Sequence, residues 1–194
     1  MTVKDARIRR TRKYLEESLL RIMETKSIKD ITVRELTERA NINRSTFYLH
    51  YSDINDVIKR IEQNLLQSFY EKLAQNMQPR TLQEDVYYFM EVVISFLKEN
   101  RHTLLILCGK NGDHSFANVL AGVTYKQTHH WFHTILGNGA DPERARLAEI
   151  FFNSGCVAML EEWVKNGDNV NSTAVLRLMF QLVLTGAKGF VADK

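Results

Sequence analysis

The sequence has few of the residues that interrupt helices, with 2 prolines and 9 glycines in 194 residues. β-Sandwiches and barrels need many turns built from Gly and Pro, so this scarcity disfavours them and favours long helices. The 2 cysteines, Cys108 and Cys156, are too few and too far apart for a disulfide scaffold or a four-thiolate metal site. They fit a reducing, cytoplasmic compartment.

Long hydrophobic runs are missing as well. The N-terminus, MTVKDARIRR, has no apolar core after its charges, so we do not expect a secretory signal. Apolar runs such as 103–108 are far shorter than the ~20 residues of a membrane-spanning helix. We therefore expect an intracellular protein without a membrane partner, made of one ordinary domain or of a small domain joined to a larger one.

Charge is unevenly distributed along the chain, although the net charge is only +3. Residues Met1 to Tyr51 include 12 lysines and arginines and 7 acidic residues, whereas the remainder includes 14 lysines and arginines and 16 acidic residues. A basic first quarter joined to a slightly acidic remainder indicates that the N-terminal end meets a polyanion.

Apolar residues recur at helical spacing throughout, which predicts an all-α fold. Thr32 and Glu35 form a capping-box pattern at the start of a short helix, and Ser52-Asp53 precedes a long helix that continues to about Gln75. That helix is long enough to connect two parts of the molecule. Further helices are predicted over 82–99, 101–110, 113–136, 142–166 and 172–190.

Two short helices joined by the turn 41–43 form a helix-turn-helix, whose second helix, predicted over 44–51, enters the DNA major groove. Arg44 can bind guanine through two hydrogen bonds, and Leu49 can pack on a thymine methyl group. The other predicted DNA-binding residues supply hydroxyl, imidazole and guanidinium groups that can bind bases or phosphates. The predicted DNA-binding residues are Arg10, Thr32, Arg34, Arg44, Ser45, Thr46, Tyr48, Leu49 and His50.

The stretches 31–40 and 43–51 closely resemble the DNA-binding domain of the tetracycline-repressor-like (TetR) family, and Thr-Phe-Tyr-x-His-Tyr is the most specific part of the match. The resemblance implies a homodimeric, all-helical regulator with a DNA-binding domain at 1–51 and an effector-binding and dimerisation domain at 52–194, including a connecting helix at 52–75. Asn41 stands where the family usually has Gly, and Ile54 stands where many members carry a phosphate-contacting Lys.

The resemblance also implies a small-molecule effector and a dimer interface in the C-terminal part. Aromatic walls with a few polar tips suit an effector pocket, and apolar residues with small neighbours on the last two helices suit a dimer. The predicted pocket residues are Tyr88, Phe96, Phe116, Tyr125, His129 and Phe152, with Trp131 as a further aromatic candidate. The predicted interface residues are Phe151, Gly155, Ala158, Met159, Met179, Leu182, Val183 and Gly186.

Three histidines, His129, His130 and His133, invite a metal hypothesis, and Glu149 could approach them in space. The Glu that metalloproteases carry after the first His is replaced by His130, so we expect a structural or pocket-edge role, with no metal and no cofactor. The cysteines are expected to be buried small apolar residues.

Three functional alternatives differ in mechanism. A repressor released from a palindromic operator by an effector is the first prediction, and an activator that responds to a metabolite is the second. The third is a helix-turn-helix adaptor that acts through protein partners, which the polar face at 44–50 disfavours. The sequence shows no Gly-rich phosphate loop, nucleophile elbow or paired carboxylates in a defined context, so we do not expect an enzyme.

Overall fold

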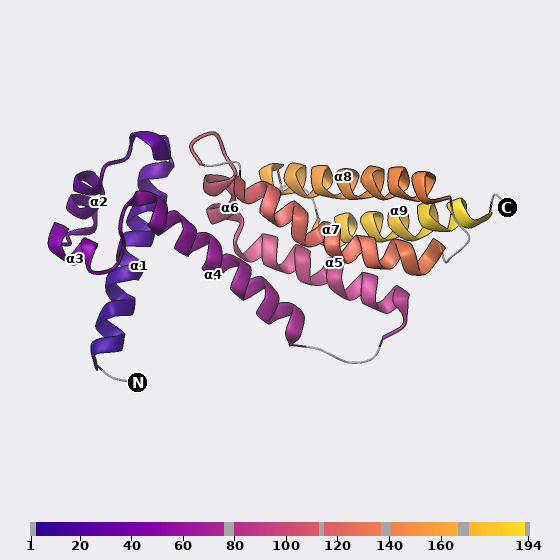
Figure 1. Ribbon diagram of the computed structural model, residues 1–194, viewed down its shortest axis with the longest axis horizontal. Helices are drawn as coiled ribbons and strands as arrows, with labels where there is room; N and C mark the ends of the chain where they lie inside the picture. The colour runs from indigo at the N-terminus through magenta and orange to yellow at the C-terminus, as the bar shows by residue number, and fades with distance from the viewer. Residues whose placement is uncertain (1–2, 76–79, 113–114, 137–140, 167–170, 193–194) are drawn as a thin grey trace. The chain divides into compact units, whose positions relative to one another are not determined.

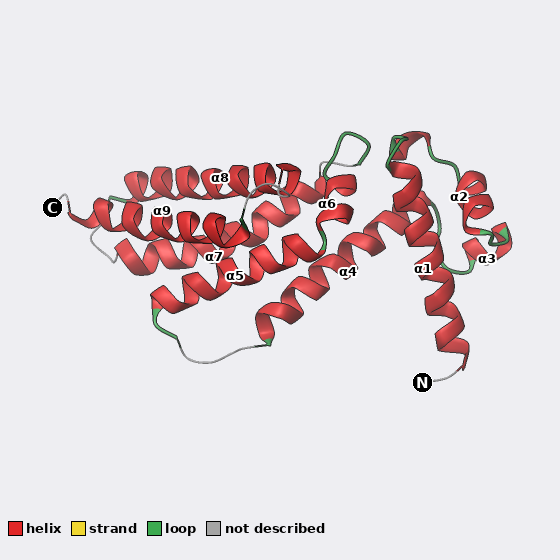
Figure 2. Cartoon of the chain, turned by 180° about the vertical axis from the view of Figure 1, so that it is seen from behind, coloured by secondary structure: helices red, strands yellow, loops and turns green. Residues whose placement is uncertain are grey.

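The computed structural model describes residues 3–75, 80–112, 115–136, 141–166 and 171–192 (Figure 1). Across these ranges the regular structure is entirely helical, which confirms the predicted all-α fold (Figure 2). Within the same ranges, every helix is too short or too polar to cross a membrane.

The helices follow the predicted segments closely. α6 ends three residues early, where the chain turns at two glycines, and a Cβ atom on Gly112 would clash with the carbonyl oxygen of Leu107. The elements are α1 (Val3–Met23), the 3-10 turn η1 (Ile28–Asp30), α2 (Val33–Ala40), α3 (Arg44–Tyr48), α4 (Ile54–Ala74), α5 (Leu82–Glu99), α6 (Arg101–Leu107), α7 (Ser115–Leu136), α8 (Pro142–Asn166) and α9 (Ser172–Ala192).

The chain forms two compact units, and the polypeptide passes between them three times. The N-terminal unit contains Met1–Tyr70 and His102–Phe116, and the C-terminal unit contains Glu71–Arg101 and Ala117–Lys194. One passage therefore lies inside α4. The predicted functional boundary between residues 51 and 52 stays a prediction.

The N-terminal unit is built on a small apolar core. Leu15 and Leu19 of α1, Leu36 of α2 and Phe47 of α3 are completely buried. Complete burial of Leu or Phe side chains contributes about 1.5–3 kcal/mol each, so these four side chains hold α2 and α3 against α1.

Thr32 and Asn41 stand at the two ends of α2. Thr32 Oγ1 accepts a hydrogen bond from Glu35 N over 3.2 Å, but the Glu35 carboxylate pairs with Lys26 Nζ over 2.7 Å. The predicted capping box is thus only half made, because a tertiary partner holds the glutamate. Asn41 adopts the left-handed conformation, with φ 53° and ψ 46°, as expected for an Asn that replaces Gly.

A segment far along the chain closes the N-terminal unit. Asn111, which follows α6, donates from Nδ2 to the Met23 carbonyl over 2.9 Å and accepts from Ile28 N over 2.9 Å. These bonds satisfy free backbone groups at the end of α1 and the start of η1. The loop after α6 therefore belongs structurally to the unit that contains the helix-turn-helix.

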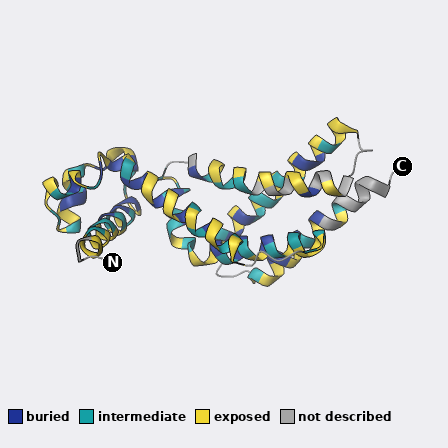
Figure 3. Cartoon of the chain, turned by 60° about the horizontal axis from the view of Figure 1, so that its bottom comes forward, coloured by how far each residue is buried: buried dark blue, intermediate teal, exposed yellow. Residues whose placement is uncertain are grey.

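In the C-terminal unit, α5, α8 and α9 each bury part of their surface (Figure 3), and α7 buries Trp131. Thr81 and Glu84 form a reciprocal capping box at the start of α5, a motif that the sequence analysis did not identify. Trp131 of α7 donates from Nε1 to Asp85 of α5 over 3.0 Å. Arg101 Nε donates to the Val164 carbonyl over 2.7 Å and so caps the end of α8.

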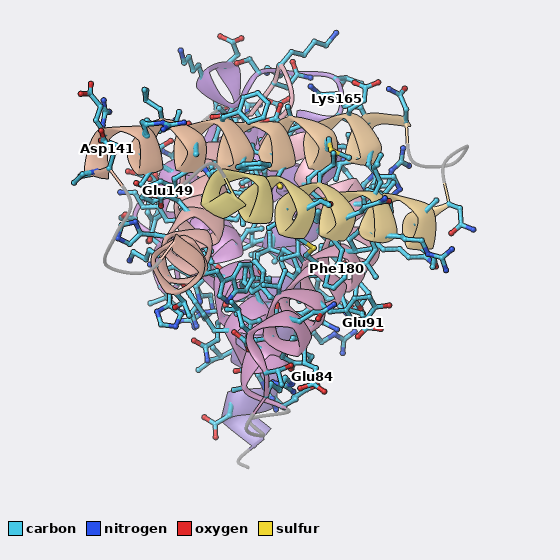
Figure 4. The ribbon with its side chains drawn as sticks, turned by 90° about the vertical axis from the view of Figure 1, so that its right-hand side faces the viewer. Glu84, Glu91, Asp141, Glu149, Lys165 and Phe180 are labelled. Atoms are coloured by element: carbon cyan, nitrogen blue, oxygen red, sulfur yellow. The ribbon has the colours of Figure 1, made fainter. Side chains whose placement is uncertain are left out.

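α7 and α8 are joined by a polar pair. Glu149 is buried on the side of α8 that faces α7 (Figure 4), and His129 Nδ1 lies 2.8 Å from its carboxylate. A buried carboxylate is costly unless it has a partner, and His129 supplies one. Glu149 thus does approach the histidine cluster, as the sequence analysis considered.

Candidate functional site

α3 presents a polar surface over a single buried aromatic residue. Phe47 is 0% exposed, whereas Tyr48 is 50% and Leu49 is 80% exposed. The helix ends at Tyr48 rather than at the predicted Tyr51, because residues 49 and 50 form a turn. Leu49 and His50 therefore follow the helix instead of continuing it. Arg44 and Ser45 are exposed, and Thr46 is half-buried.

Two arginines of this unit are held by tyrosines one helical turn further on. The Arg44 guanidinium lies 5.6 Å from the centre of the Tyr48 ring and donates to the Tyr48 hydroxyl over 3.2 Å. On α1, Arg10 lies 5.4 Å from the Tyr14 ring and donates to its hydroxyl over 3.0 Å. Each contact restricts a flexible cation and leaves it at the surface.

The hydroxyl groups near the turn are already oriented. Asn43 Oδ1 caps α3 by accepting from both Ser45 N and Ser45 Oγ over 2.9 Å. Because the Ser45 hydroxyl already donates its hydrogen bond to Asn43, it can only accept a hydrogen bond from a ligand. Thr32 Oγ1 accepts from Glu35 N and keeps its proton to donate.

Arg34 differs from the other predicted contacts because it has a competing partner. Its Nε donates to Glu38 Oε1 over 2.8 Å, with both side chains exposed, and this bond raises the pKa of Arg34. A phosphate would have to displace the glutamate. Arg34 therefore offers less free positive charge than its position on α2 indicates.

His50 and Tyr51 lie where the turn after α3 packs against α1. Burial, and after it the charge of Arg12, lowers the pKa of His50, so its imidazole is neutral near pH 7. Tyr51 is buried and donates to Glu16 Oε1 over 2.7 Å; its burial, followed by this bond, raises the pKa of its hydroxyl. Tyr51 is a structural residue of the unit.

The C-terminal unit contains an apolar cavity of about 30 Å³, and the free space around it, open solvent included, is about 400 Å³. The cavity itself has room for about two water-sized molecules. All four helices of the unit line it, through residues Phe89, Met90, Val93, Ile94, Trp131, Asn153, Cys156, Val157, Leu160 and Met179.

The six predicted pocket residues lie outside this lining. The Tyr88 hydroxyl donates to the Lys72 carbonyl, Tyr125 stacks on His129, and the Phe152 ring fills the space beside Gly186. Phe96 is buried, and Phe116 is buried in the N-terminal unit. Trp131 does line the cavity. Helical spacing identifies such aromatic residues but does not show which of them surround a common space.

Cys156 also lines this cavity, and burial raises the pKa of its thiol to about 11. The thiolate, which is the reactive form, is therefore scarce near pH 7. Cys156 acts here as a small apolar lining residue. Of the lining residues, sequence reasoning placed only Trp131 in a pocket. For Asn153 and Cys156, their spacing of three on α8 was the available signal.

The last two helices expose apolar side chains. Phe151 of α8 is 72% exposed and Leu182 of α9 is 48% exposed. Met179 and Val183, predicted at the same surface, are instead buried inside the unit. The exposed apolar residues of the two helices are Leu147, Ile150, Phe151, Leu178 and Leu182, with Gly155 and Ala158 exposed beside them. Met159 and Gly186 are half-buried.

The histidine cluster is only partly visible. His130 is exposed, and the side chain of His133 lies outside the described residues. Among the side chains that can be placed, no three His, Cys, Asp or Glu residues gather as a metal site would require.

A family model described as "Transcriptional regulator C-terminal region" (TetR_C_8) matches residues 84–185, more than half of the chain. The uncharacterized HTH-type transcriptional regulator YxbF of Bacillus subtilis (strain 168) is 26% identical over 106 residues. That match covers 53% of this chain and 27% of YxbF, so the chain spans about a quarter of that relative's length.

Solved structures share the fold at low identity. A TetR-like transcriptional regulator from Rhodococcus sp. RHA1 is 16% identical with a TM-score of 0.70, over 92% of this chain and 96% of that one. FadR from Bacillus subtilis, solved in complex with stearoyl-CoA, is 14% identical with a TM-score of 0.65, over 89% and 97%. Together with the family model, the helix-turn-helix shows that this chain belongs to the TetR family of transcriptional regulators.

Proposed function

We propose that the protein represses transcription by binding a palindromic operator as a homodimer and leaves it when a small apolar effector binds. The observation that carries the proposal is the polar surface of α3, where Arg44 is exposed and held by Tyr48 above the buried Phe47. A guanidinium at the start of a recognition helix suits bidentate binding of guanine in the major groove.

The remaining contacts divide between bases and phosphates. The Ser45 hydroxyl, which has donated to Asn43, suits a base donor such as the amino group of adenine or cytosine. Thr46, Tyr48 and Leu49 complete the base-facing set. Arg10, Thr32, Arg34 and His50 suit phosphates, which orient the protein without reading the sequence.

A second copy of the chain is the proposed partner of the exposed face on α8 and α9. Large apolar side chains such as Phe151 and Leu182 favour burial, and the exposed Gly155 and Ala158 permit close helix approach. Two-fold symmetry places the same face on both protomers and requires a palindromic operator. Sedimentation should show a dimer that Phe151→Glu converts to a monomer, while Lys165→Glu, at the exposed end of α8, leaves the dimer intact; a monomeric parent protein contradicts this part of the proposal.

The effector is proposed to bind in the cavity among α5, α7, α8 and α9. FadR, a structural relative, was solved with stearoyl-CoA. Because the cavity here measures about 30 Å³, we propose a much smaller apolar ligand for this chain. α4 continues across the boundary between the units, and the segment 102–116 after α5 returns to the N-terminal unit. A ligand that alters α5 can therefore act on the helix-turn-helix through the chain itself, with a reciprocal coupling.

The experiment that tests the proposal begins with selection from random duplex DNA. We expect enriched sequences to be palindromic, with half-sites about one helical turn (roughly 34–36 Å) apart. The best sequence is then placed before a reporter gene, whose expression should fall with the protein present. A rise would identify an activator and contradict repression, and failure to enrich any sequence would favour the protein-binding adaptor.

A further inference from the structure

A buried polar atom lies in the lining of the cavity of the C-terminal unit. Asn153 of α8 lines the cavity, and its Oδ1 atom is buried. Among the residues that the structure describes, none donates a hydrogen bond to this atom. Buried side-chain oxygens are almost always paired, and leaving one unpaired costs free energy. An unpaired acceptor in an apolar cavity therefore selects for a ligand.

We propose that the effector is a small apolar molecule with one hydroxyl group, which donates its hydrogen bond to Asn153 Oδ1. The apolar walls, with Phe89 and Trp131 on one side and Val157 on another, suit the hydrocarbon part. The inference rests on the cavity being the effector site proposed above, and it adds the chemical class of the ligand.

The same geometry predicts which molecules bind poorly. An alcohol loses its hydrogen bonds to water when it enters an apolar cavity, and it recovers that loss only if a protein acceptor replaces the water. An ether of the same composition loses less on leaving water but cannot donate. Wild-type protein should therefore prefer the alcohol, and a protein without the Asn153 amide should reverse the preference.

Two small isomers make the comparison direct: ethanol donates a hydrogen bond and dimethyl ether does not. Trp131 supplies the signal, because its indole lines the cavity, and Trp163 serves as an internal reference since it lies outside the lining. Titration of the full-length protein with each compound is followed through the two indole N–H resonances. Trp131→Phe assigns the two signals.

The wild-type protein is expected to bind ethanol about tenfold more tightly than dimethyl ether, the effect of one hydrogen bond to an otherwise unpaired acceptor. Asn153→Leu should bind the ether at least as tightly as the alcohol. Asn118→Leu, the same change at an exposed site on α7, should keep the wild-type preference. If Asn153→Leu fails to fold by circular dichroism, Asn153→Ala takes its place.

Equal binding of the two isomers by the wild-type protein overturns the inference, as does the absence of a saturable Trp131 shift up to the solubility of both. Operator affinity at saturating ethanol is measured separately. An alcohol preference that depends on Asn153 but leaves operator affinity unchanged would support the inference and contradict the proposed release. Operator release by a ligand that cannot donate a hydrogen bond would support the proposed release and contradict the inference.

Discussion

The polar groups proposed for DNA recognition lie at the surface of the N-terminal unit, whereas the polar group proposed for effector recognition lies inside an apolar cavity of the C-terminal unit. α3 exposes Arg44 and Tyr48 and buries only Phe47. On α8, Asn153 is turned into the unit while Phe151 is 72% exposed. The first arrangement suits a large charged partner such as DNA, because the phosphates of DNA remain exposed to water when it binds. The second suits a small ligand that is removed from water.

The largest effect is expected from removing the aromatic residue that supports α3. Phe47→Ala should lower the free energy of unfolding by about 3–5 kcal/mol, because it leaves a cavity in a fully packed core. Leu49→Ala, at a site that is 80% exposed, should change it by less than about 0.5 kcal/mol. Urea denaturation measures both. Similar losses for the two variants would mean that α3 does not depend on Phe47 for its position.

A second test of the comparison between the two units removes Arg44, the proposed base-reading residue, without disturbing the fold. Arg44→Ala should weaken binding to the selected operator by about 1–3 kcal/mol and relax the preference at one base position. Fluorescence anisotropy with single-base operator variants measures this. Lys98→Ala removes an exposed charge from the other unit and should leave operator affinity within about twofold. Unchanged base preference in Arg44→Ala would show that another residue reads that base.

A smaller effect is expected at the turn between α2 and α3. Asn41 has φ 53°, where a residue with a Cβ atom and no side-chain hydrogen bond is strained. Asn41→Ala should therefore destabilise the protein by about 1 kcal/mol. Asn41→Gly should be close to neutral, since Gly adopts this conformation without strain. Thermal unfolding of both variants tests this; equal behaviour of Ala and Gly would mean that the turn rearranges.

The smallest effect is expected from pH. The pKa of His50 is lowered in the free protein, so its contribution to folding stability is complete above its unfolded value of about 6.5 and declines as the pH falls through the folded value. A phosphate beside His50 would favour the protonated form. Operator affinity should accordingly rise between about pH 8 and about pH 6 in the wild type and rise less in His50→Gln. Parallel profiles would place His50 away from phosphate.

Local patterns were sufficient for those features of the N-terminal unit that depend on neighbours in the sequence. The sequence predicted a short helix that starts at Thr32 and a turn at 41–43, and α2 and Asn41 are found there. The same reasoning failed where a distant residue intervenes. Glu35 leaves its capping box for Lys26, and α3 ends early because the chain turns at Leu49 to place Tyr51 against Glu16.

The sequence by itself determined the all-α class, the positions of the helices and the helix-turn-helix, because these depend on periodicity, capping residues and the scarcity of breakers within short windows. Only the tertiary structure decided that Met179 is buried while Leu182 is exposed, that Asn111 closes the N-terminal unit, and that Asn153 faces a cavity. When a helix carries apolar residues on two faces, its local sequence does not show which face packs inside the unit and which stays exposed. Burial, and with it the chemistry of the cavity, is set by contacts between residues far apart in the chain.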